Sequence, residues 1–140
     1  MKANYKDKIP KKESEVALGN LYDMNKQMMA QEPELSEETL LEKGGLLADW
    51  IRTHSAQQYF MMLCHERRDY TVFNIRPRMV GVSINQINSM VGDVIECLQN
   101  RGTLIGMDLQ DDGAWEFWIR DEDECSAFYL FPYGAAVLEY

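Results

Sequence analysis

Long apolar runs, paired cysteines and a signal peptide are all missing from this 140-residue chain. No stretch approaches the roughly eighteen apolar residues of a membrane helix, and the N-terminal MKANYKDKIPKKESE has no apolar core. Cys64, Cys97 and Cys125 are odd in number and far apart, which favours reduced, buried thiols over a disulfide. We therefore expect a cytoplasmic protein that does not enter membranes.

Signatures of catalysis and of metal binding are missing as well. His54 and His65 have no carboxylate or cysteine at the spacing of a triad or a metal site, and the chain has no phosphate-binding loop, nucleophile elbow or CxxC pair. A calcium loop that begins at Asp108 would need a glutamate at its last ligand position, where the chain has Ile119. We expect no enzymatic activity, no cofactor and no metal, with a small enzyme of unfamiliar site as a minor alternative.

Positive charge is scarce. The chain has 14 Lys and Arg against 23 Asp and Glu, a formal charge of −9. Five lysines and one aspartate fall in the first twelve residues, and this local charge of +4 leaves −13 on the remaining 128 residues. An acidic body repels the phosphates of nucleic acids and anionic lipids. We therefore expect no direct binding to nucleic acid or to a membrane surface.

Hydrophobic periodicity predicts three helices, over residues 14–30, 37–53 and 84–100. Ser36 is a suitable N-cap for the second helix, and Ser83 with Gln86 has the spacing of a capping box for the third. The first helix is the least secure. Three alternatives are open for this helix: it packs on the core, it is only loosely docked on the core, or it detaches to bind a partner or a second copy. Its methionines would suit an adaptable binding surface.

Strands are predicted at 59–64 and 70–75 as a hairpin, although the first of these segments also fits a helix. An antiparallel meander follows at 103–109, 114–120 and 126–131, with a short last strand at 136–140. This order predicts an α+β fold, with helices packed on one face of a mostly antiparallel sheet. We expect residues 14–140 to form one domain behind a flexible basic arm at 1–13. Trp118 lies on the opposite strand face from Trp115 and Phe117, and is either partly exposed or covered by another element.

Two charged clusters are candidate sites. The first consists of the carboxylates that bracket the middle strand of the meander, namely Asp108, Asp111, Asp112, Asp121, Glu122, Asp123 and Glu124. They are either solvated turns or an array that acts on a partner. The second cluster, Arg67, Arg68 and Arg76, is either an ion-paired hairpin rim or an anion site, with Tyr70 or Trp118 available to stack a base.

Three segments carry a resemblance: RRDYTVF at 67–73, ECLQNRG at 96–102, and DGAWEFWIR at 112–120 followed by YLF at 129–131. Together they resemble small uncharacterised proteins encoded by bacteriophages and prophages, over about residues 59–140. The resemblance implies an inhibitor or decoy in the host cytoplasm that occupies a host protein, sometimes by imitating the charge of DNA. It assigns no functional residue.

Our leading hypothesis is a non-enzymatic protein that binds and inhibits a host defence or nucleic-acid-handling protein through the seven carboxylates. The alternative is an oligomeric protein that sequesters a nucleotide-like anion through Arg67, Arg68 and Arg76, beside Tyr70 and Trp118. The sequence leaves the oligomeric state open.

Overall fold

The structure is a computed structural model that describes residues 15–76 and 79–133, with side chains described from residue 21 onward. The expected arm at 1–13 and the expected strand at 136–140 lie outside the described residues. The helices are α1 (Glu15–Met29), α2 (Glu37–Thr53) and α3 (Ile84–Gln99), with a short 3-10 turn at Ser55–Gln57. The strands are β1 (Tyr59–Cys64), β2 (Tyr70–Asn74), β3 (Thr103–Leu109), β4 (Trp115–Asp121) and β5 (Glu124–Tyr133).

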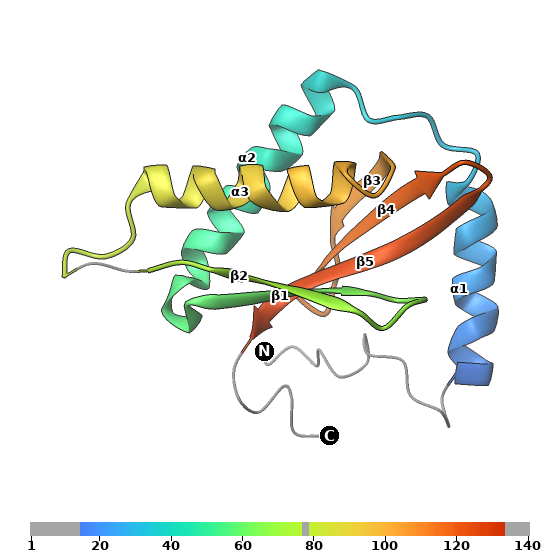
Figure 1. Cartoon of the computed structure of the whole chain (residues 1–140), viewed down its shortest axis with the longest axis horizontal. Coiled ribbons are helices and arrows are strands. Elements are labelled where there is room, and N and C mark those ends of the chain that lie inside the picture. The colour runs from blue at the N-terminus through green and yellow to red at the C-terminus, as the bar shows by residue number, and fades with distance from the viewer. Residues whose placement is uncertain (1–14, 77–78, 134–140) are drawn as a thin grey trace.

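All five strands form one antiparallel sheet with the order β2-β1-β5-β4-β3 (Figure 1). The predicted α+β class with a mostly antiparallel sheet is therefore confirmed. Segment 59–64 is a strand, and it lies inside the sheet between β2 and β5. Its unbroken apolar sequence is typical of a strand that is buried on both faces, and five of its six residues are buried.

The helix boundaries follow the capping residues. Ser36 accepts a hydrogen bond from the backbone N–H of Thr39, and Ser83 with Gln86 forms the complete capping box. Such caps satisfy backbone N–H groups that have no partner within the helix, and each stabilises a helix by about 1 kcal/mol. The predicted starts of α2 and α3 are thereby confirmed.

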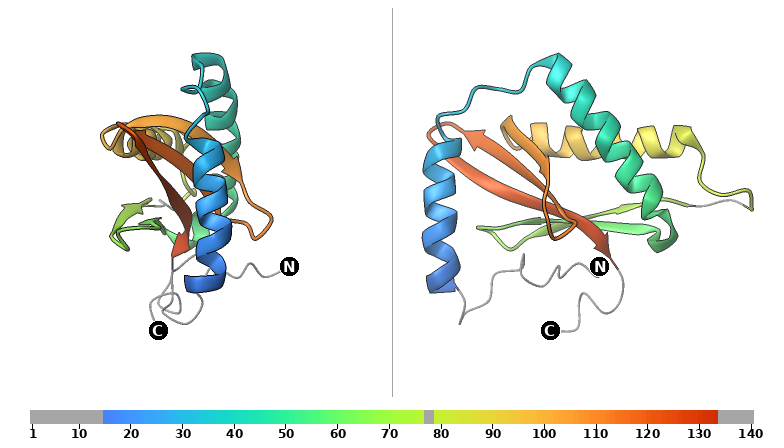
Figure 2. Two further views of the ribbon diagram at one scale, coloured as in Figure 1. Left: turned by 90° about the vertical axis from the view of Figure 1, so that its right-hand side faces the viewer. Right: turned by 180° about the vertical axis from the view of Figure 1, so that it is seen from behind.

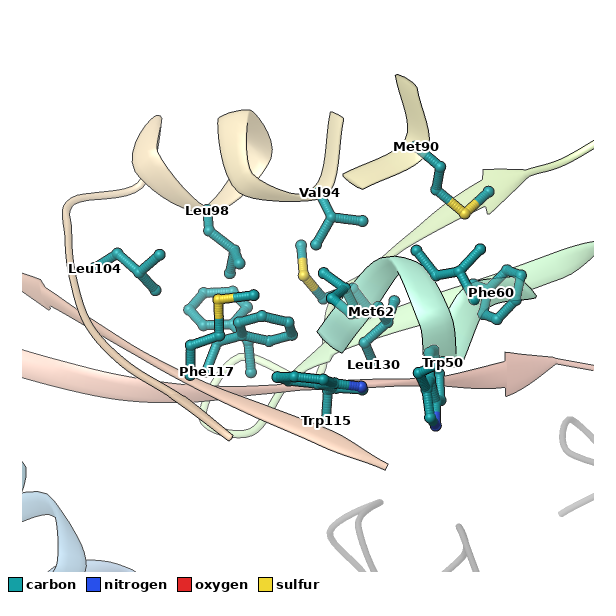
Figure 3. Close-up of a cluster of buried hydrophobic side chains, with 14 of the residues drawn as sticks. Trp50, Phe60, Met62, Met90, Val94, Leu98, Leu104, Trp115, Phe117 and Leu130 are labelled. Carbon is teal, nitrogen blue, oxygen red and sulfur yellow. The ribbon is translucent and has the colours of Figure 1, made fainter. Parts of the chain in front are cut away.

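The main hydrophobic core lies between one face of the sheet and the helices α2 and α3. Phe60, Met62, Trp115, Phe117 and Leu130 point from the strands toward these helices (Figure 3). The helices contribute Leu47, Trp50, Ile51, Met90, Val94 and Leu98 to the same cluster. Trp50 is fixed further by its indole N–H, which donates to the carbonyl of Gly113 at 2.9 Å.

Helix α1 lies on the other side of the sheet, near the end where β4 turns into β5 (Figure 2). A second buried cluster on that side contains Tyr22 of α1 together with Trp118, Ala127 and Tyr129 of the strands. Helices therefore occupy both sides of the sheet, with α2 and α3 on one and α1 on the other. Trp118 is only 4% exposed, because α1 covers it.

Candidate partner-binding surface

The structure divides the seven predicted carboxylates into two groups at opposite ends of β4. Asp121, Glu122, Asp123 and Glu124 form the β4–β5 turn, whereas Asp108, Asp111 and Asp112 lie around the β3–β4 turn. A strand rises about 3.3 Å per residue, so the two turns are about 30 Å apart. The seven residues are therefore not a single array.

Two of the three carboxylates at the β3–β4 turn have structural contacts. Asp108 forms an ion pair with Lys43 of α2. The carboxylate of Asp112 accepts a hydrogen bond from the backbone N–H of Ala114 at 3.0 Å, a contact that orders a turn. This group helps to join α2 and the β3–β4 turn to the sheet.

The β4–β5 turn, in contrast, presents four consecutive exposed carboxylates. It lies beside the C-terminal end of α1 (Figure 1). The guanidinium of Arg120 donates to the carbonyl of Ala30 at 3.4 Å and to that of Glu32 at 2.6 Å. These contacts fix the segment after α1, with its exposed Glu32 and Glu34, next to the turn. We call residues 21–34 and the β4–β5 turn the α1 end.

Polar and aromatic contacts hold α1 on the sheet. The Tyr22 hydroxyl donates to the carboxylate of Glu66 at 3.1 Å and accepts from the backbone N–H of Ala127 at 3.3 Å. Its ring lies between those of His65 and Trp118, with centroid distances of 3.9 and 5.5 Å. Burial raises the pKa of the Tyr22 phenol, so this hydroxyl remains a hydrogen-bond donor at neutral pH.

Further along α1, Lys26 contributes two contacts with the body. Its ammonium forms an ion pair with Glu66, which raises the pKa of Lys26. Its backbone carbonyl accepts a hydrogen bond from the thiol of Cys125 at 3.1 Å. The inner face of α1 is thus bound to the β1–β2 turn and to β5.

The outer face of α1 carries an apolar stripe made of Leu21, Met24 and Met28. These side chains are 62%, 62% and 66% exposed. Their spacing of three and four residues places them on one side of the helix. Leu21 and Met28 are exposed, whereas Tyr22 is buried and Met29 is partly buried, so the apolar residues of this helix lie on two sides. The spacing of Leu21, Met24 and Met28 resembles that of a heptad repeat, and this pattern in the sequence could have predicted the stripe.

The residues of the predicted anion site do not come together. Arg67 and Arg68 lie in the β1–β2 turn, and Arg76 follows the opposite end of β2, about 25 Å away at the rise of a strand. Tyr70 is exposed on β2, but Trp118 is buried beneath Tyr22. These five residues do not line a common pocket among the described residues.

Both histidines have structural contacts. His54 ends α2, where its Nδ1 lies 2.8 Å from the carbonyl of Trp50, and the His65 ring packs against those of Tyr22 and Tyr129. In the described part of the chain, no group of three His, Cys, Asp or Glu residues is placed to hold a metal ion. None of the described helices has both the length and the apolar character to cross a membrane.

Comparisons with protein-family models, with curated proteins and with solved structures gave no match to this chain. A functional interpretation therefore depends on the surfaces of the molecule itself. The α1 end carries both exposed charge and exposed apolar side chains, on elements that are fixed to the core.

Proposed function

We propose that this protein is a non-enzymatic inhibitor that binds a host defence or nucleic-acid-handling protein through the α1 end. One observation carries the proposal. The four exposed carboxylates of the β4–β5 turn lie beside the C-terminal end of α1, the helix that carries the exposed Leu21, Met24 and Met28, and Arg120 links the turn to the segment that follows α1. Proteins that handle nucleic acid present basic surfaces, which such a group of carboxylates would complement.

The two parts of this surface have different physical roles in binding. The carboxylates steer a basic partner toward the α1 end, an effect that is screened by salt. The apolar stripe provides the area that is removed from water, and full burial of each such side chain contributes about 1.5–3 kcal/mol before the entropic costs of association. Methionine also adapts its shape to a partner surface. The carboxylates would therefore determine mainly the association rate, and the apolar stripe would determine mainly the lifetime of the complex.

Two buried titratable groups, the Cys125 thiol and the Tyr129 phenol, have raised pKa values. Burial raises the pKa of the Cys125 thiol, whereas a nucleophilic cysteine needs a lowered pKa. Burial and the neighbouring Glu116 likewise raise the pKa of Tyr129. At neutral pH these groups stay protonated and act as structural donors or apolar fillers.

A matched pair of variants tests the proposal. Asp121→Asn with Asp123→Asn removes two charges from the α1 end, and Asp108→Asn with Asp111→Asn removes two charges from the opposite end of β4. The wild-type protein, tagged and incubated with a bacterial lysate, is expected to capture a stoichiometric protein at low salt and to release it at high salt. The first variant should lose this protein and the second should retain it.

The captured protein is then assayed directly. Its binding to DNA or RNA, or its defence activity, should fall when the wild-type chain is added, and should not fall with the Asp121→Asn, Asp123→Asn variant. Equal losses in the two charge variants would assign the effect to net charge rather than to the α1 end. Unchanged capture by both variants would refute the proposal.

A further inference from the structure

Strand β2 forms one edge of the sheet, and three of its five residues have backbone N–H and C=O groups that face outward. Within the hairpin, Cys64 N–H donates to the Asp69 carbonyl and Ile75 N–H donates to the Gln58 carbonyl. These two bonds fix the alternation of the antiparallel ladder, in which Thr71 and Phe73 bond to β1. The N–H and C=O groups of Tyr70, Val72 and Asn74 therefore point away from the sheet. No described residue pairs with them.

This edge lacks the devices that usually protect an edge strand. The sequence of β2, YTVFN, contains no charged residue and no proline, and the strand is regular along its pairing with β1. The opposite edge strand, β3, is protected. It has a register shift between Leu104 and Gly106, it contains Asp108, and its Leu104 carbonyl accepts the backbone N–H of Leu35. Of the two edges, only β2 is open to another strand in the described structure.

The side chains of β2 also favour an added strand. Tyr70 and Val72 are 59% and 40% exposed, although their partners on β1, Leu63 and Met61, are buried. Tyr70 and Val72 share the sheet face on which α1 lies, and they pair with Leu63 and Met61, which belong to the apolar cluster on that face. Apolar side chains of a sixth strand would pack beside them.

Charge decides which strand fits. Arg67 precedes β2 and Arg76 follows it, and both are exposed. Two copies of β2 paired about a two-fold axis at Val72 would place Arg68 of each copy opposite Arg76 of the other. Like charges directly opposite each other disfavour such a pair. Carboxylates in these positions would instead be attracted.

We propose that β2 binds an extended segment of a partner protein by strand addition, and that this segment has alternating apolar residues between acidic ends. Backbone hydrogen bonds to Tyr70, Val72 and Asn74 provide the attachment, and Arg67 and Arg76 select the acidic ends. This site lies on β2 and does not involve the α1 end. The proposal of strand addition can therefore be tested independently of the proposed function.

A labelled synthetic peptide is the probe. It has alternating valine and threonine between two glutamates at each end, and its binding to the full chain is followed by fluorescence polarisation. Saturable binding is expected, with at least about tenfold weaker binding for the same peptide with lysines in place of the glutamates. The absence of saturable binding, or equal affinity for both peptides, would overturn the proposal.

Val72→Pro tests the backbone attachment. The Val72 N–H faces outward, so proline removes a donor from the open edge without removing a bond to β1. We expect at least about a tenfold loss of affinity for the acidic peptide, while circular dichroism shows a folded chain. Val72→Lys is the second variant, in case proline unfolds the hairpin, because a lysine on the edge also opposes strand addition.

Two further results distinguish strand addition at β2 from peptide binding at the α1 end and from self-association of the chain. The Asp121→Asn, Asp123→Asn variant should bind the peptide as the wild type does, because its changes lie at the α1 end. In sedimentation experiments, the wild-type chain should not form a dimer that is lost in the Val72→Pro variant. Such a dimer would instead assign the edge to a second copy of the chain, and would overturn the proposal.

Discussion

Tyr22 of α1 and Trp118 of β4 stack with ring centroids 5.5 Å apart and ring planes 21° from parallel. This pair joins the helix to the sheet between residues that are almost a hundred positions apart in the sequence. The hydroxyl of the same tyrosine reaches Glu66 and Ala127, so one side chain connects α1 to β4, to β5 and to the β1–β2 turn. The position of the α1 end depends on this contact.

Tyr22→Ala should therefore destabilise the protein strongly. Replacing a buried aromatic side chain by alanine costs about 3–5 kcal/mol, and the value here should lie near the lower limit because α1 is at the surface. Tyr22→Phe keeps the ring stack but removes the hydroxyl contacts with Glu66 and Ala127, and should cost about 1–2 kcal/mol. Urea unfolding measures both values. The control is Tyr70→Ala on the exposed edge, expected within about 0.5 kcal/mol of wild type. Equal effects of Tyr22→Ala and Tyr70→Ala would show that α1 is not held by this contact.

Substitutions of two glycines by alanine should change the free energy of unfolding in opposite directions. A Cβ at Gly106 would lie 2.7 Å from the Met29 side chain of α1 and 3.3 Å from the Trp118 side chain. Gly106→Ala should therefore destabilise the protein by about 1–2 kcal/mol. A Cβ at Gly45, within α2, would meet nothing within 4 Å, so Gly45→Ala should stabilise the helix by about 0.5–1 kcal/mol.

The cause of the Gly106 effect is checked with a double variant. Met29→Ala shortens the side chain that approaches Gly106, so Gly106→Ala should be less destabilising in that background. Additive effects in thermal unfolding would indicate that the overlap with Met29 is not the cause.

Stability should fall at alkaline pH. Burial raises the pKa of Tyr22 and Tyr129 above the ordinary value of 10.0, and the charges of Glu66 and Glu116 act in the same direction. As the pH rises, the unfolded chain loses these protons before the folded chain does. The free energy of unfolding should therefore be unaffected by them below about pH 9 and fall above about pH 10.

Each buried tyrosine contributes up to about 1.4 kcal/mol per pH unit to this decrease. Urea unfolding at several pH values gives the slope, and the ultraviolet absorbance of tyrosinate shows when the buried phenols ionise. Tyr22→Phe should reduce the slope above about pH 10. A wild-type stability that stays constant to about pH 11 would contradict the burial of these two hydroxyls.

The apolar stripe should matter for binding and not for folding. Met24→Gln with Met28→Gln changes two exposed side chains, so the free energy of unfolding should shift by no more than about 0.5 kcal/mol. Capture of the partner by the α1 end should weaken at least about tenfold. Asp23→Glu, at an exposed position that is not three or four residues from any member of the stripe, keeps the charge and is the control, which should bind as the wild type does. If the Met24→Gln, Met28→Gln variant captures the partner as well as the wild type does, the stripe is not part of the interface.

Local patterns predicted the elements well. Helix α3 has an apolar stripe and a capping box, and both act within a few residues. The meander also follows local signals, because β3, β4 and β5 are joined by short polar turns. The ambiguous segment Tyr59–Cys64 could not be assigned in this way. Its strand structure is determined by pairing with β5, more than sixty residues later in the chain.

The candidate site was harder to predict because it depends on which strand ends meet in space. Asp112 and Asp121 are near each other in the sequence, yet an extended strand carries them to opposite ends of the sheet. Glu32 and Arg120 are 88 positions apart and in contact. Which apolar side of α1 is buried and which is exposed could not be predicted for a related reason. Leu21 and Tyr22 are adjacent apolar residues, and only the position of the sheet determines which of them is buried.

The bonds from Arg120 to the carbonyls of Ala30 and Glu32 also have a consequence for how the chain is made. During synthesis α1 leaves the ribosome before the strands do, and its docking site is complete only after β5 has been translated. At about 5–20 residues per second, this interval lasts several seconds. For that time the methionines and Tyr22 of α1 remain accessible to chaperones, and pulsed chemical labelling of nascent chains would detect them. Helix α1 is thus among the last of the described elements to reach its native place, although it is made before the strands on which it docks.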